Sequence, residues 1–213
     1  MKIPDNLAQA LLGSLLLATC CGTPTLAEAP SQLVELTRID PTLRLDIRYA
    51  SNRNFMGFPL YSEPRAFLQK DAAEALRKVN EELHAQGLGL LILDAYRPWS
   101  VTKLMWDKTP PSKRDYVADP QKGSRHNRGA AVDLTIVDLQ SGKPIAMPSS
   151  YDDFSQKAHH SYQGGSELAR GNRAKLRELM EKHGFEALSN EWWHYDYQGW
   201  QNYPIMDKKF EEI

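Results

Sequence analysis

An aspartate in the middle of an apolar strand constrains the fold of this chain more than any other feature. Residues 129–137 read GAAVDLTIV, a pattern that predicts a strand. Side chains alternate between the two faces of a strand, so Val132, Leu134 and Ile136 face one side and Asp133 faces the other. An unpaired buried carboxylate costs free energy, and the fold must therefore bring a cation or several hydrogen-bond donors to Asp133.

The residues around Asp133 leave room for such a partner. Ala131 and Thr135 share its face and are small. His126 lies in the turn that leads into the strand, and Gly129 permits a sharp entry. A histidine beside a carboxylate is more often a structural hydrogen bond than a metal site, so this pair alone leaves both interpretations open.

The remaining apolar patterns predict one α+β domain. Turn residues and long polar stretches predict loops over residues 51–65 and 107–123. No internal repeat or second domain is evident, so we expect helices packed on a mostly antiparallel sheet. The expected strands are 43–50, 88–95, 129–137 and 193–198, and the expected helices are 66–86, 99–106 and 166–184, the last with Ser166 as its N-cap.

Length and charge narrow the class of protein. The chain has 213 residues, enough for one well-buried domain. It carries 26 Lys and Arg against 27 Asp and Glu, a formal net charge of −1. Proteins that bind nucleic acid usually show a basic excess, so we expect no nucleic-acid partner, and a small charged substrate remains compatible.

The N-terminus resembles a secretory signal peptide. Residues 7–18 are mostly apolar and too short to span a membrane, and small residues follow them. We expect cleavage after Ala27, which makes 1–27 the signal peptide and 28–213 the mature domain, located in the periplasm or cell envelope. A lipoprotein anchored at Cys20 and a buried N-terminal helix are the alternatives. Both cysteines lie in this segment, so the mature domain would have no disulfide and no cysteine nucleophile.

A second group of polar residues lies near the C-terminus. The stretch NEWWHYDY places Glu191 three residues before His194, which shares a strand face with Asp196. Two histidines and one carboxylate from separate strands match a catalytic zinc site with a fourth position open for water. The predicted ligands are therefore His126, Asp133 and His194. Glu191, a nearby carboxylate outside that set, is the predicted general base.

The other four histidines fit structural roles better. His84 and His183 lie near the ends of predicted helices, where the helix dipole favours a cation at the C-terminus. His159 and His160 lie in a predicted loop. We expect structural roles for all four, and metal ligation by His159 or His160 is the alternative.

These motifs resemble those of the D-alanyl-D-alanine dipeptidases of the vancomycin-resistance type, zinc peptidases related to the zinc D,D-carboxypeptidases. The stretch SRHNRGAAVDLT (124–135) meets the family pattern S-x-H-x-x-G-x-A-x-D, and EWWH meets E-x-W-H. Three further segments look like the family's: DAYRP (94–98), RYASNRNFMG (48–57) and MPSSYDDFSQKAHH (147–160). The resemblance runs from about residue 33 to the end of the chain, and it implies a zinc D,D-peptidase-like fold.

The resemblance implies a catalytic role for five side chains. His126, Asp133 and His194 would bind one zinc ion per chain. Glu191 would take a proton from the zinc-bound water and pass it to the leaving amine. Arg97 would stabilise the oxyanion of the tetrahedral intermediate.

Four further residues would bind the two ends of a dipeptide. By the resemblance, Ser124 would help to hold the substrate carboxylate, and Asp152 would pair with the ammonium group. Tyr49 and Tyr61 would line the ammonium end. The implied reaction is the hydrolysis of D-alanyl-D-alanine to two D-alanines.

Two other functions remain open at this point. A zinc D,D-carboxypeptidase or endopeptidase that trims longer cell-wall peptides would use the same metal ligands. A zinc-binding module without catalysis is a further alternative, although the presence of both Glu191 and Arg97 disfavours it. No G-x-S-x-G motif is present, so the sequence does not indicate a serine hydrolase.

Overall fold

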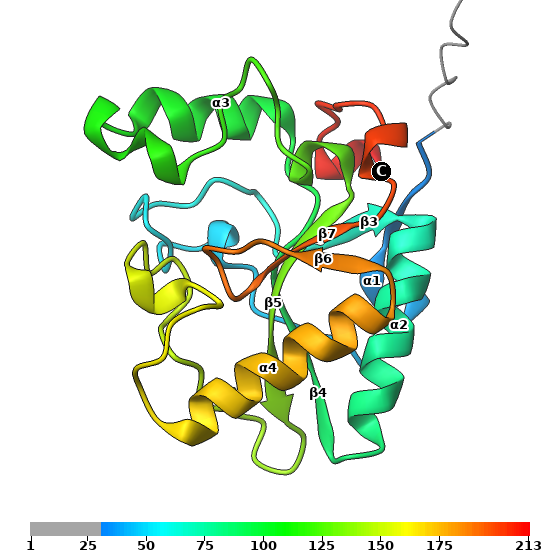
Figure 1. The fold of residues 1–213 in the computed structure, drawn as a ribbon. Coiled ribbons are helices and arrows are strands. Elements are labelled where there is room, and N and C mark those ends of the chain that lie inside the picture. Colours follow the sequence, from blue (N-terminus) through cyan, green and yellow to red (C-terminus); the bar gives the residue numbers. More distant parts are fainter. Residues whose placement is uncertain (1–30) are drawn as a thin grey trace, which may run out of the picture.

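The computed structural model describes residues 31–213 (Figure 1). The predicted signal peptide over residues 1–27, its cleavage site and Cys20 lie outside the described residues. Within residues 31–213, no helix combines the length and the apolar character that a membrane crossing requires.

A five-stranded sheet forms the centre of the fold. Strand β2 runs parallel to β4, and the pairs β4/β5, β5/β7 and β6/β7 are antiparallel. A second, two-stranded sheet pairs β1 with β3 in antiparallel fashion. The expected α+β fold with a mostly antiparallel sheet is therefore confirmed. In spatial order the larger sheet holds β2 (Arg44–Leu45), β4 (Leu88–Asp94), β5 (Ala131–Asp138), β7 (His194–Tyr197) and β6 (Phe185–Ala187), and the smaller one holds β1 (Leu33–Glu35) and β3 (Phe67–Gln69).

Helices pack against this sheet and against each other (Figure 1). Helix α2 contacts β4, α4 contacts β6, and α2 and α4 also contact each other. The Ser166 Oγ atom caps α4 by accepting a hydrogen bond from Ala169 N at 3.1 Å, as expected. The α-helices of the described chain are α1 (Leu36–Ile39), α2 (Lys70–His84), α3 (Trp99–Lys108) and α4 (Glu167–Lys182).

The main core fixes which way β5 faces. Val132 on β5, Leu76 on α2 and Met180 on α4 belong to one cluster and have no exposed surface. Burial of these apolar side chains favours folding and holds one face of β5 against the helices. Asp133 is thereby turned to the opposite face, where the loop that carries Tyr151 packs over the sheet.

The helix predicted over residues 66–86 is wrong at its start. Residues Phe67–Gln69 form strand β3, and α2 begins at Lys70. The β3 ladder depends on β1, a segment distant in the sequence, so local periodicity could not reveal it.

The strand predicted over residues 43–50 is also too long. Only Arg44–Leu45 pairs with β4, and Arg48–Ala50 form a 3₁₀ turn. This turn takes the chain out of the sheet and places Tyr49 at the cavity described below.

The sequence analysis did not predict two short elements. The predicted loop over 107–123 contains a 3₁₀ helix at Pro111–Tyr116, and strand β6 follows Gly184 directly. The predicted central strands and the helix over 166–184 match the structure to within two residues at each end, because their apolar patterns are long.

Candidate active site and metal centre

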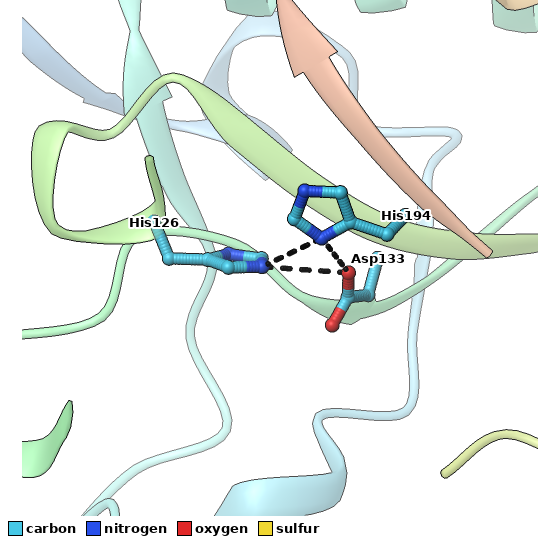
Figure 2. A group of neighbouring side chains, drawn as sticks. All are labelled: His126, Asp133 and His194. Carbon is cyan, nitrogen blue, oxygen red and sulfur yellow. Dashed lines mark hydrogen bonds and ion pairs between the residues drawn. The ribbon is translucent and has the colours of Figure 1, made fainter. Parts of the chain in front are cut away.

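Strand pairing brings the predicted metal ligands together. In the register of β5 and β7, Asp133 lies opposite His194. His126 comes from the 3₁₀ turn His126–Arg128, which ends at Gly129 with a φ of 64° before the chain enters β5. Glycine adopts this left-handed conformation readily, and the turn places the His126 ring beside the other two side chains (Figure 2).

Three electron-pair donors converge in this group (Figure 2). Asp133 Oδ1 lies 3.0 Å from His194 Nδ1 and 3.4 Å from His126 Nε2. The two ring nitrogens lie 3.2 Å apart. All three residues are buried, and their ligand atoms lie within 4.8 Å of one another.

The partners on the far sides of the rings fix the tautomers. His126 Nδ1 lies 2.7 Å from the carbonyl oxygen of Ala95, which can only accept a hydrogen bond. His194 Nε2 lies 2.9 Å from Asp196 Oδ1. Both outer nitrogens therefore donate, and the inner nitrogens are the atoms that would bind a metal ion once they have lost their protons. This arrangement fits a metal ion, because outer hydrogen bonds of this kind orient metal-binding histidines.

The electrostatics of the cluster also favour positive charge. Burial opposes protonation of His194, but hydrogen bonds to Asp133 and Asp196 outweigh it and raise the pKa of His194 to about 10. Burial disfavours the charged form of Asp133, yet the neighbouring charges and hydrogen bonds of His126 and His194 hold the pKa of Asp133 below its ordinary value. The site thus attracts a cation, and a divalent ion between two imidazoles and a carboxylate meets that demand.

A cavity of about 280 Å³ adjoins the cluster. This volume is small for a ligand site and suits a small molecule. The cavity gathers the predicted site residues from loops and strands that are far apart in the sequence, with the exception of Tyr61. Eight of the nine line it: Tyr49, Arg97, Ser124, His126, Asp133, Asp152, Glu191 and His194.

Arg97 is held in place by a buried carboxylate. Its Nε and Nη2 atoms donate to Asp94 Oδ2 at 3.2 and 2.6 Å, and both side chains are almost fully buried. The guanidinium carbon lies 5.1 Å from the centre of the Tyr49 ring. A charged hydrogen bond inside the protein fixes geometry well, so the guanidinium has one defined position in the cavity wall.

Tyr61 lies behind the cavity, which corrects its predicted place at the substrate. Its hydroxyl donates to Asp94 Oδ1 at 2.8 Å, and its side chain is buried. The sequence could not reveal this position, because tertiary packing decides whether a loop residue lines the cavity or lies behind it.

Asp152 is a half-buried carboxylate in the cavity lining. It accepts hydrogen bonds from the Tyr49 hydroxyl at 3.2 Å and from Phe55 N at 3.3 Å. Burial, reinforced by the charge of Asp133, raises the pKa of Asp152 to about 7. A carboxylate in this position is ready to bind a cationic group, since that group would offset the cost of its burial.

Glu191 and Ser124 complete the predicted set. Glu191 lies one turn before His194, whose backbone N–H donates to Glu191 O at 3.2 Å. Burial is the main cause that raises the pKa of Glu191, with a further contribution from the charge of Asp133. The Ser124 Oγ atom accepts a hydrogen bond from His126 N at 3.2 Å.

Three residues of the site were missed as functional positions. Asp94 holds Arg97, Asp196 holds His194, and the Tyr151 hydroxyl donates to Asp133 Oδ2 at 2.9 Å. The i, i+2 spacing of His194 and Asp196 on one strand was the available signal for Asp196. The contact of Tyr151 depends on how a long loop folds, and no local pattern encodes it.

Among the described residues, the other four histidines lie outside the donor group. His183 Nε2 lies 2.7 Å from Glu82, between the C-terminal ends of α4 and α2. Within the described part of the chain, the one group of three or more histidine, cysteine or acidic residues with metal-binding geometry is that of His126, Asp133 and His194.

Comparisons with known proteins extend over nearly all of the described chain. The Peptidase M15 family model, described as D-Ala-D-Ala dipeptidase, matches residues 29–212. A D-alanyl-D-alanine dipeptidase of Escherichia coli K12 is 34% identical over 180 residues, covering 84% of this chain and 92% of its own length. The D-alanyl-D-alanine dipeptidase of Enterococcus faecium is 37% identical over 174 residues, covering 72% of this chain and 85% of its own length. A solved LD-carboxypeptidase, LdcB, is 20% identical, with a TM-score of 0.43 over 69% of this chain and 70% of that one.

Proposed function

Because this chain belongs to the D-Ala-D-Ala dipeptidase family of zinc metallopeptidases, we propose that it hydrolyses D-alanyl-D-alanine to two D-alanines. The observation that carries the proposal is a cavity of about 280 Å³ that has the buried metal-binding group in its wall and the half-buried carboxylate of Asp152 in its lining. A dipeptide carries an ammonium and a carboxylate at a fixed separation, and such a cavity can bind both ends.

His126, Asp133 and His194 would hold one zinc ion. When bound, zinc lowers the pKa of a coordinated water to about 7 and polarises the scissile carbonyl. Three protein ligands leave a coordination position open, as catalytic zinc sites do.

Glu191 would act as the general base and then as the general acid. Glu191 lines the cavity beside the donor group. Burial raises the pKa of Glu191, so its carboxylate accepts a proton more readily than an exposed carboxylate does, as a general base requires. In the proposed reaction Glu191 accepts a proton from the attacking water. It then delivers that proton to the nitrogen of the leaving D-alanine.

Arg97 would bind the oxyanion of the tetrahedral intermediate. Among the described contacts, Asp94 engages Nε and Nη2, and the guanidinium faces the cavity. A donor that is already oriented needs no reorganisation as the oxygen becomes charged, which typically lowers the barrier by a few kcal/mol.

Substrate length separates the dipeptidase from a carboxypeptidase that acts on longer peptides. In the proposal, Asp152 binds the ammonium group of the free dipeptide and Ser124 helps to bind its carboxylate. Acetylation of the amino group removes the positive charge and leaves the half-buried Asp152 without a cationic partner, which costs about 2–5 kcal/mol in comparable charge pairs. We therefore expect N-acetyl-D-Ala-D-Ala to be cleaved with a kcat/KM at least ~30-fold lower than that of D-Ala-D-Ala.

The test compares these two substrates on the zinc-loaded protein and on the Asp152→Asn variant. Asparagine tolerates the positive φ of this position, so the backbone is kept. The variant should narrow the difference, mainly by slowing the free dipeptide. Equal cleavage of blocked and free dipeptide would favour the carboxypeptidase alternative, and no cleavage of either would favour a zinc-binding module without catalysis.

We also propose that the protein is exported to the periplasm or cell envelope. The apolar run 7–18 and the small residues before Ala27 support this, and the family match begins only at residue 29. Mass spectrometry of the protein from its own cells should find a chain that starts at residue 28. A lipid on Cys20 would select the lipoprotein alternative, and an intact Met1 on cytosolic protein would refute export.

A further inference from the structure

Tyr61 links the buried pair of Asp94 and Arg97 to the end of the chain. Its hydroxyl donates to Asp94 Oδ1, while Asp94 Oδ2 accepts from Arg97. The other side of the Tyr61 ring packs against Phe210, with 4.9 Å between the ring centres. Phe210 is itself buried and also contacts Phe67, at 5.2 Å between ring centres.

The C-terminal segment, residues 203–213, is attached to the same part of the fold at several points. The Tyr96 hydroxyl donates to the carbonyl of Lys208 at 3.0 Å and accepts from the Lys208 N–H at 2.9 Å. Met206 N donates to the carbonyl of Asn127 at 2.9 Å. The segment therefore holds the residues that flank both Arg97 and His126 along the chain.

A buried ion pair needs such support. Asp94 has two carboxylate oxygens, and a buried carboxylate is stable only when both are satisfied. The Tyr61 hydroxyl satisfies Oδ1 and thereby prevents the carboxylate from rotating away from Arg97. Phe210 packs against the Tyr61 ring, and this contact limits the positions from which that hydroxyl can donate.

We propose that Tyr61 and Phe210 are positioning residues for the reaction, acting through Asp94 to hold Arg97 where the oxyanion forms. Phe210 then supports the active site from behind, although the C-terminal segment contributes no residue to the cavity lining. This inference rests on the proposed function, since it assigns Arg97 to the oxyanion.

The test is a double-mutant cycle with the zinc-loaded protein and D-Ala-D-Ala. Tyr61→Phe removes only the hydroxyl, and a hydrogen bond to a charged group is strong enough that its loss should lower kcat about tenfold. KM and bound zinc should stay close to those of the wild type, and Tm should fall by a few degrees because Asp94 Oδ1 loses its donor. In an Arg97→Ala background the same change should alter kcat less than twofold, because the group that Tyr61 positions is gone.

Phe210 is tested by Phe210→Ala and Phe210→Leu. The alanine variant should lower kcat by a similar factor, and leucine, which refills the space, should restore most of it. Glu211→Ala is the matched control, because this exposed residue of the same segment contacts the Ser62 hydroxyl rather than Tyr61. Its kcat should equal that of the wild type.

The possible outcomes separate the two proposals. A wild-type enzyme that does not cleave D-Ala-D-Ala overturns the proposed function and this inference with it. An active wild type in which Tyr61→Phe keeps full kcat, raises only KM, or costs the same factor in both backgrounds overturns the positioning role alone.

Discussion

Asp152 combines a strained backbone conformation with a raised side-chain pKa. Among residues 31–213 it alone has a side chain together with a positive φ, of 59°. Such a conformation costs about 1–3 kcal/mol and persists only where the surroundings hold it, and here the Tyr49 hydroxyl and Phe55 N hold the carboxylate. Strain of this kind is often found at ligand-binding positions, which agrees with the ammonium-binding role proposed for Asp152.

The pKa of Asp152 leads to a prediction about substrate binding. Burial and the charge of Asp133 raise the pKa to about 7, and a bound cation beside Asp133 would move it downward from there. Below this pKa the carboxyl group is neutral and loses its attraction for an ammonium. We expect KM for D-Ala-D-Ala to rise as the pH falls from 8 to 6, by up to about tenfold for one group with a pKa near 7. Steady-state kinetics across this range should show the rise, and Asp152→Asn should remove it. A rise of equal size in the variant would assign the titration to another group.

Glu191→Gln should separate metal binding from proton transfer. Glu191 lies outside the donor group of His126, Asp133 and His194, so the variant should keep one equivalent of zinc. The amide cannot accept the proton of the attacking water, and kcat should fall by about 10²–10⁴-fold. Metal analysis and kinetics on the same preparation check both parts. Zinc lost in proportion to activity would identify Glu191 as a ligand instead.

Short sequence motifs predicted which residues meet around the cavity. They did not predict the contacts that support these residues from behind. His126, Asp133 and His194 come together because their motifs lie at the ends of adjacent elements of the sheet. The place of Tyr61 behind Arg97 depends on side-chain packing against the C-terminal segment. No periodicity in the sequence carries that information.

Strand β5 is the element on which the site depends. Its apolar face packs under α2 and α4, and its other face presents Asp133 to the cavity. A register shift of one residue would exchange these faces, so burial of the apolar side chains also fixes the position of the ligand. This element was predictable because its pattern is long and unambiguous. Strands β1, β2 and β3 have only two or three residues each, and their pairing with distant segments decides their conformation.

The turn before β5 should be sensitive to substitution at Gly129. Its φ is 64°, and an added Cβ would lie 2.4 Å from Leu33 Cδ2. Gly129→Ala should therefore lower the free energy of unfolding by roughly 1–3 kcal/mol. Gly171→Ala is the matched control, since Gly171 lies inside α4 with ordinary φ and no atom within 4 Å of an added Cβ. It should raise stability by about 0.5–1 kcal/mol. Urea denaturation measures both, and equal effects at the two positions would contradict the assigned role of the turn.

The metal-binding group lies on the face of β5 that is turned away from the main apolar core. The main apolar cluster includes α2, α4, β4 and β5 and does not require the metal group for its continuity. In this respect the protein differs from small zinc domains, in which the metal supplies most of the folding energy. The metal group instead joins the turn at His126 to strands β5 and β7.

Removal of zinc should therefore weaken the fold without abolishing it. A ligand that binds only the folded state stabilises it by RT ln(1 + [L]/Kd), about 2.7 kcal/mol when free zinc is 100 times its Kd. For a domain of this size, that free energy corresponds to a Tm shift of roughly 5–10 °C. Calorimetry with and without a chelator should show this shift, and the chelated protein should keep its far-UV circular dichroism. The double variant His126→Ala, His194→Ala is the control and should show no dependence of Tm on zinc. The same shift in that variant would mean that zinc stabilises the fold from a different site, and the proposed ligand set would then be wrong.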